Sequence, residues 1–165
     1  MNIEILYIVL PLMIAVSGVE KSVTYKWWAR NRGDRVLAAR PQAAIAIEEL
    51  KKLSVRGFAL LVAEEVLLTL GLAAIFLDGC LWPLLAVFCG FSLVHLGHIL
   101  QTVIARSYVP GLVTSLLLMP YCFIGMANVA QRWSVLYLVV ATVIGAAVVG
   151  LNIWGMHNLL RKAEF

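Results

Sequence analysis

Ionisable side chains placed inside long apolar runs are the feature that most constrains this sequence. An apolar run of about 20 residues spans a bilayer as a helix, and a charged group within it opposes insertion. Such groups are therefore retained mainly where they bind, pair or react. The residues concerned are Glu20, Glu64, Glu65, His95, His98 and, near the C-terminal end, His157.

The composition is typical of an integral membrane protein. Hydrophobic residues make up 62% of the chain and charged residues 13%, and the mean hydropathy is +0.94. The apolar runs do not alternate as barrel strands do, so we predict an all-α, polytopic fold with about five transmembrane helices in one domain, residues 1–165. The predicted spans are Ile3–Ser22, Phe58–Leu77, Trp82–Ile104, Tyr108–Val129 and Ser134–Leu160.

The distribution of basic residues predicts the orientation. Cytoplasmic loops carry an excess of Lys and Arg, and Arg132 is the one basic residue expected on the opposite side. The N-terminus is therefore predicted outside and the C-terminus in the cytoplasm. The net charge of +4 then favours membrane lipids as partners, and not nucleic acid. The residues expected on the cytoplasmic side are Lys26, Arg30, Arg32, Arg35, Arg40, Lys51, Lys52, Arg56, Arg106, Arg161 and Lys162.

The long connection, about residues 24–56, is predicted to lie in the cytoplasm and to hold one interfacial helix. Pro41 suits the first turn of a helix. After it, Ala43, Ile47 and Leu50 share one face, while the opposite face is charged. Amphipathic segments of this kind lie in the headgroup region of a bilayer.

The ionisable residues are predicted to converge in the cytoplasmic half. Glu64 and Glu65 lie roughly 12 Å from the cytoplasmic end of their helix, at 1.5 Å per residue. His95 and His98 come in the last turns of a helix that descends to the same side, as does Glu20 on the first helix. Imidazoles with carboxylates are suitable ligands for zinc, iron or manganese. We therefore predict that these five residues form a metal site, with Glu64 or Glu65 as ligand or general base.

A purely structural role stays open for the same residues. Because Glu64 and Glu65 are adjacent, their side chains diverge by about 100°, so they meet at one cavity only at its edges or face two different neighbours. Either carboxylate can instead pair with Lys21, Arg106 or a histidine and hold helices together. No Glu-x-x-His pair occurs in the sequence, so the pattern of the dinuclear carboxylate bundles is incomplete.

The turn between the third and fourth predicted spans carries a candidate binding motif. Pro110 suits the start of a helix, and Gly111 allows a close backbone approach. Arg106 and Tyr108, beside the positive end of that helix, are predicted to hold a phosphate or a lipid headgroup, with Gln101 orienting an imidazole. The alternative is that Arg106 and Tyr108 are ordinary residues of the membrane interface around a helix start and bind no ligand.

The run from His98-Ile99-Leu100-Gln101 through Arg106-Ser107-Tyr108-Val109-Pro110-Gly111-Leu112-Val113-Thr114 resembles the central stretch of the HXXEE-domain family. These are small multi-pass bacterial membrane proteins. The namesake motif is expected late in the first helix, where this chain reads Ser17-Gly18-Val19-Glu20-Lys21. Glu20 matches, whereas Ser17 stands in place of the histidine and Lys21 in place of the second glutamate. The resemblance implies a helical fold in the bacterial inner (cytoplasmic) membrane, and no particular reaction.

Two classes of function follow from these observations. One is a metal-dependent enzyme that acts on a lipid-like substrate entering from the membrane. The other is a non-catalytic lipid-binding or assembly subunit. Its partner would be a second copy of the chain or another membrane protein, and Ala141-xxx-Gly145 is a candidate close-packing face. Ion transport is disfavoured because the polar residues do not continue into the outer halves of the predicted helices.

Overall fold

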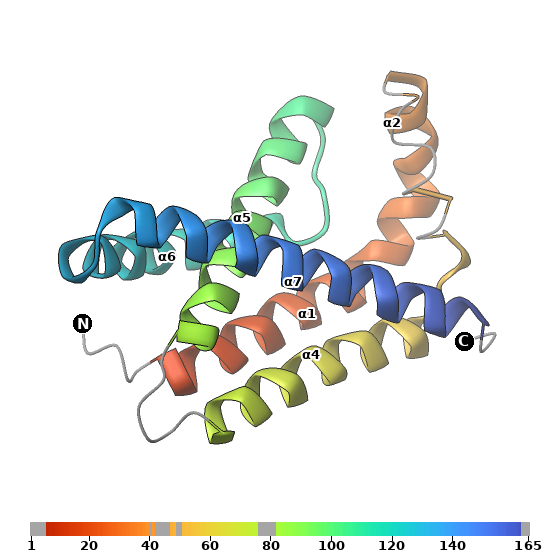
Figure 1. Ribbon diagram of the computed structural model, residues 1–165. Helices are drawn as coiled ribbons and strands as arrows, with labels where there is room; N and C mark the ends of the chain where they lie inside the picture. Colours follow the sequence, from red (N-terminus) through yellow and green to blue (C-terminus); the bar gives the residue numbers. More distant parts are fainter. Residues whose placement is uncertain (1–5, 40, 42–46, 49–50, 76–81, 163–165) are drawn as a thin grey trace.

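Helices account for the secondary structure of this protein. The computed structural model describes residues 6–39, 41, 47–48, 51–75 and 82–162. No strand occurs in these ranges, which confirms the predicted all-α class. The helices are α1 (Leu6–Asn31), α2 (Gly33–Ala39), α4 (Val55–Ile75), α5 (Trp82–Ala105), α6 (Leu112–Arg132) and α7 (Val135–Lys162) (Figure 1).

Within the described ranges, the helices α4, α5, α6 and α7 are each long and apolar enough to cross a membrane. This supports the prediction of a polytopic membrane protein, and their bounds lie within a few residues of four predicted spans. The first predicted span falls in α1, which is not one of these four. The second half of α1 carries Glu20, Lys21, Lys26 and Arg30, so it is much more polar than the first half.

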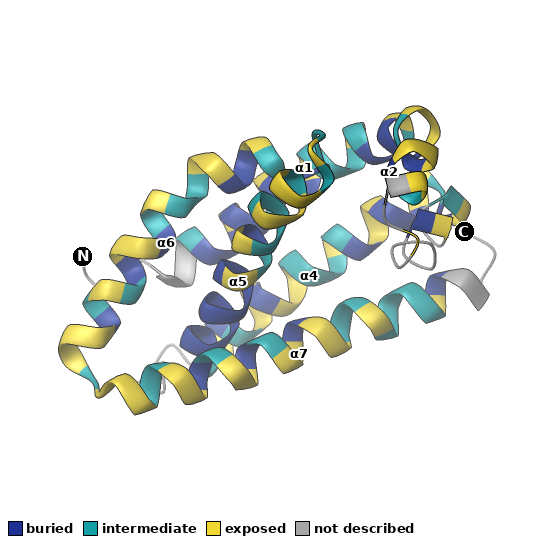
Figure 2. Cartoon of the chain, turned by 90° about the horizontal axis from the view of Figure 1, so that it is seen from above, coloured by how far each residue is buried: buried dark blue, intermediate teal, exposed yellow. Residues whose placement is uncertain are grey.

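Close backbone contacts hold the helices together. Gly18 of α1 packs on Val62 of α4, where a Cβ would overlap the valine side chain. On the other side of the bundle, α5 crosses α7 at Gly90 and Gly145, and a Cβ on Gly145 would overlap the Ala86 carbonyl oxygen. Small residues allow this approach of two helices in a membrane. Figure 2 shows α5 as the most continuously buried helix, between α6 and α7.

The connection between the first two predicted spans differs from the prediction because α1 does not end at Ser22. It continues to Asn31, and α2 follows directly. The extension is buried: Tyr25 stacks on Phe58 of α4 with ring centroids 4.6 Å apart, and its hydroxyl donates a hydrogen bond to the Leu53 carbonyl. Aromatic burial of this kind stabilises the extra turns of α1 against α4.

Only part of the predicted interfacial helix can be compared, because Ala43 and Leu50 lie outside the described residues. Ile47 is buried in a small cluster with Trp28, Ala29 and Val36.

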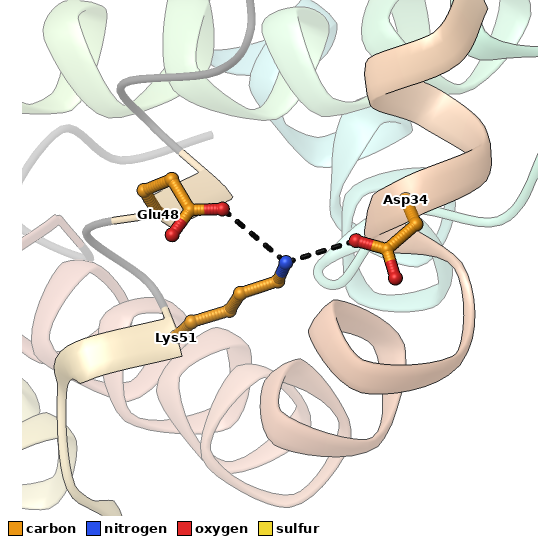
Figure 3. Close-up of polar contacts among 3 residues, drawn as sticks. All are labelled: Asp34, Glu48 and Lys51. Atoms are coloured by element: carbon orange, nitrogen blue, oxygen red, sulfur yellow. Dashed lines mark hydrogen bonds and ion pairs between the residues drawn. The ribbon is translucent and has the colours of Figure 1, made fainter.

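On the exposed side of this connection, Lys51 joins two acidic side chains. The Lys51 ammonium donates hydrogen bonds to Asp34 at 2.9 Å and to Glu48 at 3.3 Å (Figure 3). These bonds, the one to Asp34 above all, raise the pKa of Lys51. The contact links α2 to the segment before α4.

Candidate functional site

Glu20 joins α1 to the turn before α6 and to the first residues of α6 through five hydrogen bonds. Its Oε1 accepts from the Tyr108 hydroxyl at 2.7 Å and from the backbone N–H groups of Gly111 and Val113, both at 3.2 Å. Its Oε2 accepts from the Thr114 backbone N–H at 2.7 Å and from the Thr114 hydroxyl at 2.6 Å. Both carboxylate oxygens are thus occupied by donors from the protein itself.

The local sequence explains why α6 takes its cap from another helix. Gly111 stands at the N-cap position with φ of 94°, and a glycine has no side chain with which to cap the helix. The first N–H groups of a helix lack partners within the helix, and its N-terminal end attracts negative charge. Glu20 accepts hydrogen bonds from these N–H groups and places a negative charge at the N-terminal end of α6. The predicted helix start at Tyr108 is therefore wrong by four residues, since the left-handed turn at Gly111 delays α6 until Leu112.

The two histidines of α5 lie beside this contact. His95 is 1% exposed, and its Nδ1 is 3.0 Å from the Ser115 hydroxyl on α6. Its Nε2 and both ring nitrogens of His98 are buried without a hydrogen-bond partner among the described residues. Gln101, which was predicted to orient an imidazole, interacts with the His98 ring but forms no well-aligned hydrogen bond with it. A buried imidazole without partners carries a desolvation penalty that a ligand or water would relieve.

Lys21 occupies the centre of the polar cluster. Its charge acts on Glu20 of α1, on Glu65 of α4 and on His95 and His98 of α5. The same side chain crowds the turn before α6, because a Cβ on Gly111 would stand 2.9 Å from Lys21 Cε. Lys21 thus interacts with ionisable groups from α1, α4 and α5.

Glu64 faces away from this cluster. Its Oε2 accepts a hydrogen bond from the Asn152 side-chain amide of α7 at 3.1 Å. Adjacent residues on a helix diverge by about 100°, so Glu65, which interacts electrostatically with Lys21, points in a different direction from Glu64, which contacts α7. The sequence left two arrangements open for Glu64 and Glu65, a shared cavity or two different neighbours. The structure has the second arrangement.

A groove of about 580 Å³ adjoins Glu64 between α4 and α7. Figure 1 shows these two helices running alongside each other, with the C-terminal end of α7 near the start of α4. Glu64 is the charged residue among the groove's lining side chains, and the rest are apolar. They are Leu60, Ala63, Leu67, Leu68, Met156 and Leu160.

The other predicted site residues have separate surroundings. Arg106 is exposed, at the left-handed turn that ends α5, with φ of 48°. Tyr108 binds Glu20, where a phosphate or headgroup was predicted. Within the described ranges, no three His, Cys, Asp or Glu side chains are grouped in a way that could hold a metal ion. The predicted ligands Glu20 and Glu64 are instead directed to α6 and α7, and the roles assigned to the site residues stay predictions.

Two residues of the site were missed as contributors to it. The sequence predicted no role for Ser115, which lies one residue after Thr114 at the start of an apolar helix and contacts His95. Lys21 was predicted to pair with a glutamate and to stand in place of the motif's second glutamate, and not to interact with the histidines of α5. Its place directly after Glu20, where the motif has a second acid, was the available signal.

Comparison with known proteins gives a family but no function. The family model for proteins of unknown function with an HXXEE motif matches residues 6–125. No curated protein and no solved structure matches the chain. The matched region contains α1, α4, α5 and most of α6, so it includes Glu20, Lys21, Glu64, Glu65 and both histidines of α5. The chain belongs to the HXXEE family.

Proposed function

We propose that this protein is a non-catalytic, lipid-binding protein of the bacterial inner membrane, with its N-terminus outside and its C-terminus in the cytoplasm. The excess of Lys and Arg in residues 24–56 and after α7 supports this orientation. The ligand is a single-chain, lipid-like molecule whose polar end is an amine. It binds in the groove between α4 and α7.

The observation that carries this proposal is the Glu64 carboxylate in an otherwise apolar groove. Glu64 is nine residues after Val55, so it lies about 14 Å along a 21-residue helix, near its middle. A charged group at such a depth is a functional candidate by default. The described contacts give it one hydrogen bond, from Asn152, and leave Oε1 for a ligand.

The lining of the groove supports an amphiphilic ligand. Its side chains are apolar apart from Glu64, and small-molecule sites are mostly apolar with a few polar groups that orient the ligand. The leucines and Met156 suit an alkyl chain. A carboxylate in low dielectric selects a cationic donor over a neutral or anionic group.

The metal-dependent enzyme is less well supported by the same geometry. Such a site needs carboxylate and imidazole lone pairs directed at one point. Glu20 directs both oxygens at α6, and Glu64 is directed at Asn152. Lys21 places a positive charge among the remaining candidates.

Native mass spectrometry of the full-length protein in mild detergent tests the proposal, with hexadecylamine as the probe. The variants are Glu64→Gln and, as a matched control, Glu48→Gln, which neutralises an exposed carboxylate outside the groove. We expect the wild type and Glu48→Gln to bind one amine, and Glu64→Gln to bind it about tenfold more weakly or worse, as loss of one charge-assisted hydrogen bond requires.

Hexadecanol and hexadecanoic acid test the choice of polar group. Binding of the amine above both supports the proposal. Equal binding of the amine by the wild type and Glu64→Gln, or a preference for the acid, would overturn it.

A further inference from the structure

The turn that joins α5 to α6 carries a second inference, which does not depend on the groove between α4 and α7. We propose that this turn and the end of α1 form a binding site for a phosphate group. The ligand is the headgroup of an anionic phospholipid or a soluble phosphate ester with the same chemistry. The groups that hold it are the guanidiniums of Arg32 and Arg106, the Ser107 hydroxyl and the Trp28 indole N–H.

Arg106 has a backbone conformation that favours glycine. Its φ is 48°, the one positive φ of a residue other than glycine in the described ranges. The Arg106 N–H donates to the Val103 carbonyl at 3.3 Å, and the Ser107 N–H donates to the Thr102 carbonyl at 3.4 Å. These two bonds form the Schellman arrangement that ends many helices, in which glycine is the usual residue at this position. A side chain held in a left-handed turn despite its cost points to a function of that side chain.

The two arginines of the proposed site have no acidic partner in the described part of the chain, where the ion pairs are those of Lys51. Arg106 is exposed and Arg32 is partly exposed, so both guanidinium groups are accessible to a ligand. Arg32 follows Trp28 by one helical turn, and its N–H donates to the Trp28 carbonyl at 2.8 Å. Residues one turn apart lie on the same side of a helix, so Arg32 and Trp28 are neighbours at the end of α1.

Two unpaired donors lie beside these arginines. Trp28 is 4% exposed and belongs to the small cluster on which Ala105, Tyr108 and Val109 pack, so the indole and the turn are parts of one packed unit. Neither the indole N–H nor the Ser107 hydroxyl has a hydrogen-bond partner among the described residues. A buried donor without an acceptor costs free energy, and an acceptor from a ligand removes that cost.

The chemistry of these groups favours a phosphate. Guanidinium and indole N–H groups donate hydrogen bonds and accept none, whereas phosphate oxygens accept them and carry the negative charge that arginine binds in a bidentate manner. Asp34, two residues after Arg32, is bound by Lys51. Tyr108, which the sequence predicted at this site, donates its hydroxyl to Glu20 and takes no part in it.

Native mass spectrometry of the full-length protein in mild detergent tests this proposal, with phosphatidylglycerol as the probe. Diacylglycerol with the same chains lacks the phosphate, and glycerol 3-phosphate lacks the chains. The variant Arg106→Gly removes the guanidinium without straining the turn, because glycine adopts a positive φ freely. Arg30→Gln is the matched control. It removes an exposed arginine from the same end of α1, two residues from Trp28 and therefore on the other side of the helix.

We expect the wild type and Arg30→Gln to bind one phosphatidylglycerol and no diacylglycerol. Arg106→Gly should bind the phospholipid about tenfold more weakly or worse, as loss of one charge-assisted hydrogen bond requires. Trp28→Phe keeps an aromatic ring, removes the N–H and should weaken binding about three- to tenfold. Binding of phosphatidylglycerol well above glycerol 3-phosphate assigns the site to a lipid headgroup, and equal binding assigns it to a soluble phosphate ester; both support a phosphate site.

Three results would overturn the proposal. The first is equal binding of phosphatidylglycerol by the wild type and by Arg106→Gly that is folded as judged by circular dichroism. The second is binding of diacylglycerol as tightly as phosphatidylglycerol. The third is an equal loss in Arg30→Gln, which would mean that general positive charge attracts the lipid. Binding of hexadecylamine should be unchanged in Arg106→Gly, which separates this test from that of the groove.

Discussion

Glu20 and Glu64 are two carboxylates on neighbouring helices, and their surroundings are opposite. Glu20 accepts five hydrogen bonds from the turn before α6 and its first residues. Glu64 accepts one described bond, from Asn152, and faces an apolar groove. A carboxylate with every lone pair engaged is a part of the scaffold, whereas one that is partly engaged is available to a ligand.

This difference separates stability from binding in the two regions. Changes around Glu20 should lower the free energy of unfolding and leave the groove intact. Changes at Glu64 should weaken ligand binding in the groove and leave the free energy of unfolding nearly unchanged. The following variants test the separation in decreasing order of expected effect on stability.

Glu20→Ala should have the largest effect, a loss of at least about 3 kcal/mol in the free energy of unfolding. Hydrogen bonds to a charged group contribute about 1.5–3 kcal/mol each, and the variant leaves the donors of α6 unpaired. Denaturation in detergent, followed by circular dichroism, measures the loss. Glu20→Gln keeps one carbonyl oxygen and should lose less; an unchanged stability in Glu20→Ala would show that α6 does not depend on this cap.

Gly111→Ala should lower stability by about 2 kcal/mol, because a residue with a Cβ is strained at a φ of 94°. The Cβ would also meet Lys21 and His98. Gly97→Ala is the matched control on α5, where a Cβ would meet nothing within 4 Å. The same denaturation assay should find the control neutral or slightly stabilised, and equal losses in both variants would contradict the assigned turn.

Tyr108→Phe should lower stability by about 1.5 kcal/mol, since it removes one hydrogen bond to the Glu20 carboxylate and keeps the ring. Combining it with Glu20→Ala in a double-mutant cycle checks the partner. If Tyr108 acts through Glu20, the phenylalanine should add almost nothing in the Glu20→Ala background. Additive losses would assign the hydroxyl to another partner.

Glu64→Gln should change stability least, by less than about 0.5 kcal/mol, because the glutamine carbonyl still accepts from Asn152. Thermal unfolding without added ligand measures this. A loss as large as that of Tyr108→Phe would mean that Glu64 supports the fold as Glu20 does.

The helices long and apolar enough to cross a membrane were predictable because lipid demands long apolar runs, and the four in the described ranges lie close to their predicted bounds. The convergence of Glu20, His95 and His98 at one site was predicted from helix depth and stays a prediction. Sequence could not predict that Glu20 binds backbone N–H groups, because such donors are present in every helix start and become specific only when helices pack. It also could not choose a direction for Glu64, since that depends on the rotation of α4 against α7.

The measurement that tests the central contrast most directly is the thermal shift produced by hexadecylamine in the wild type, Tyr108→Phe and Glu64→Gln. A ligand at one hundred times its dissociation constant adds about 2.7 kcal/mol to stability. We predict a clear upward shift in the wild type and in Tyr108→Phe, despite the lower starting stability of the latter, and almost none in Glu64→Gln. An equal shift in Glu64→Gln, or no shift in the wild type, would contradict the division of roles between the two carboxylates.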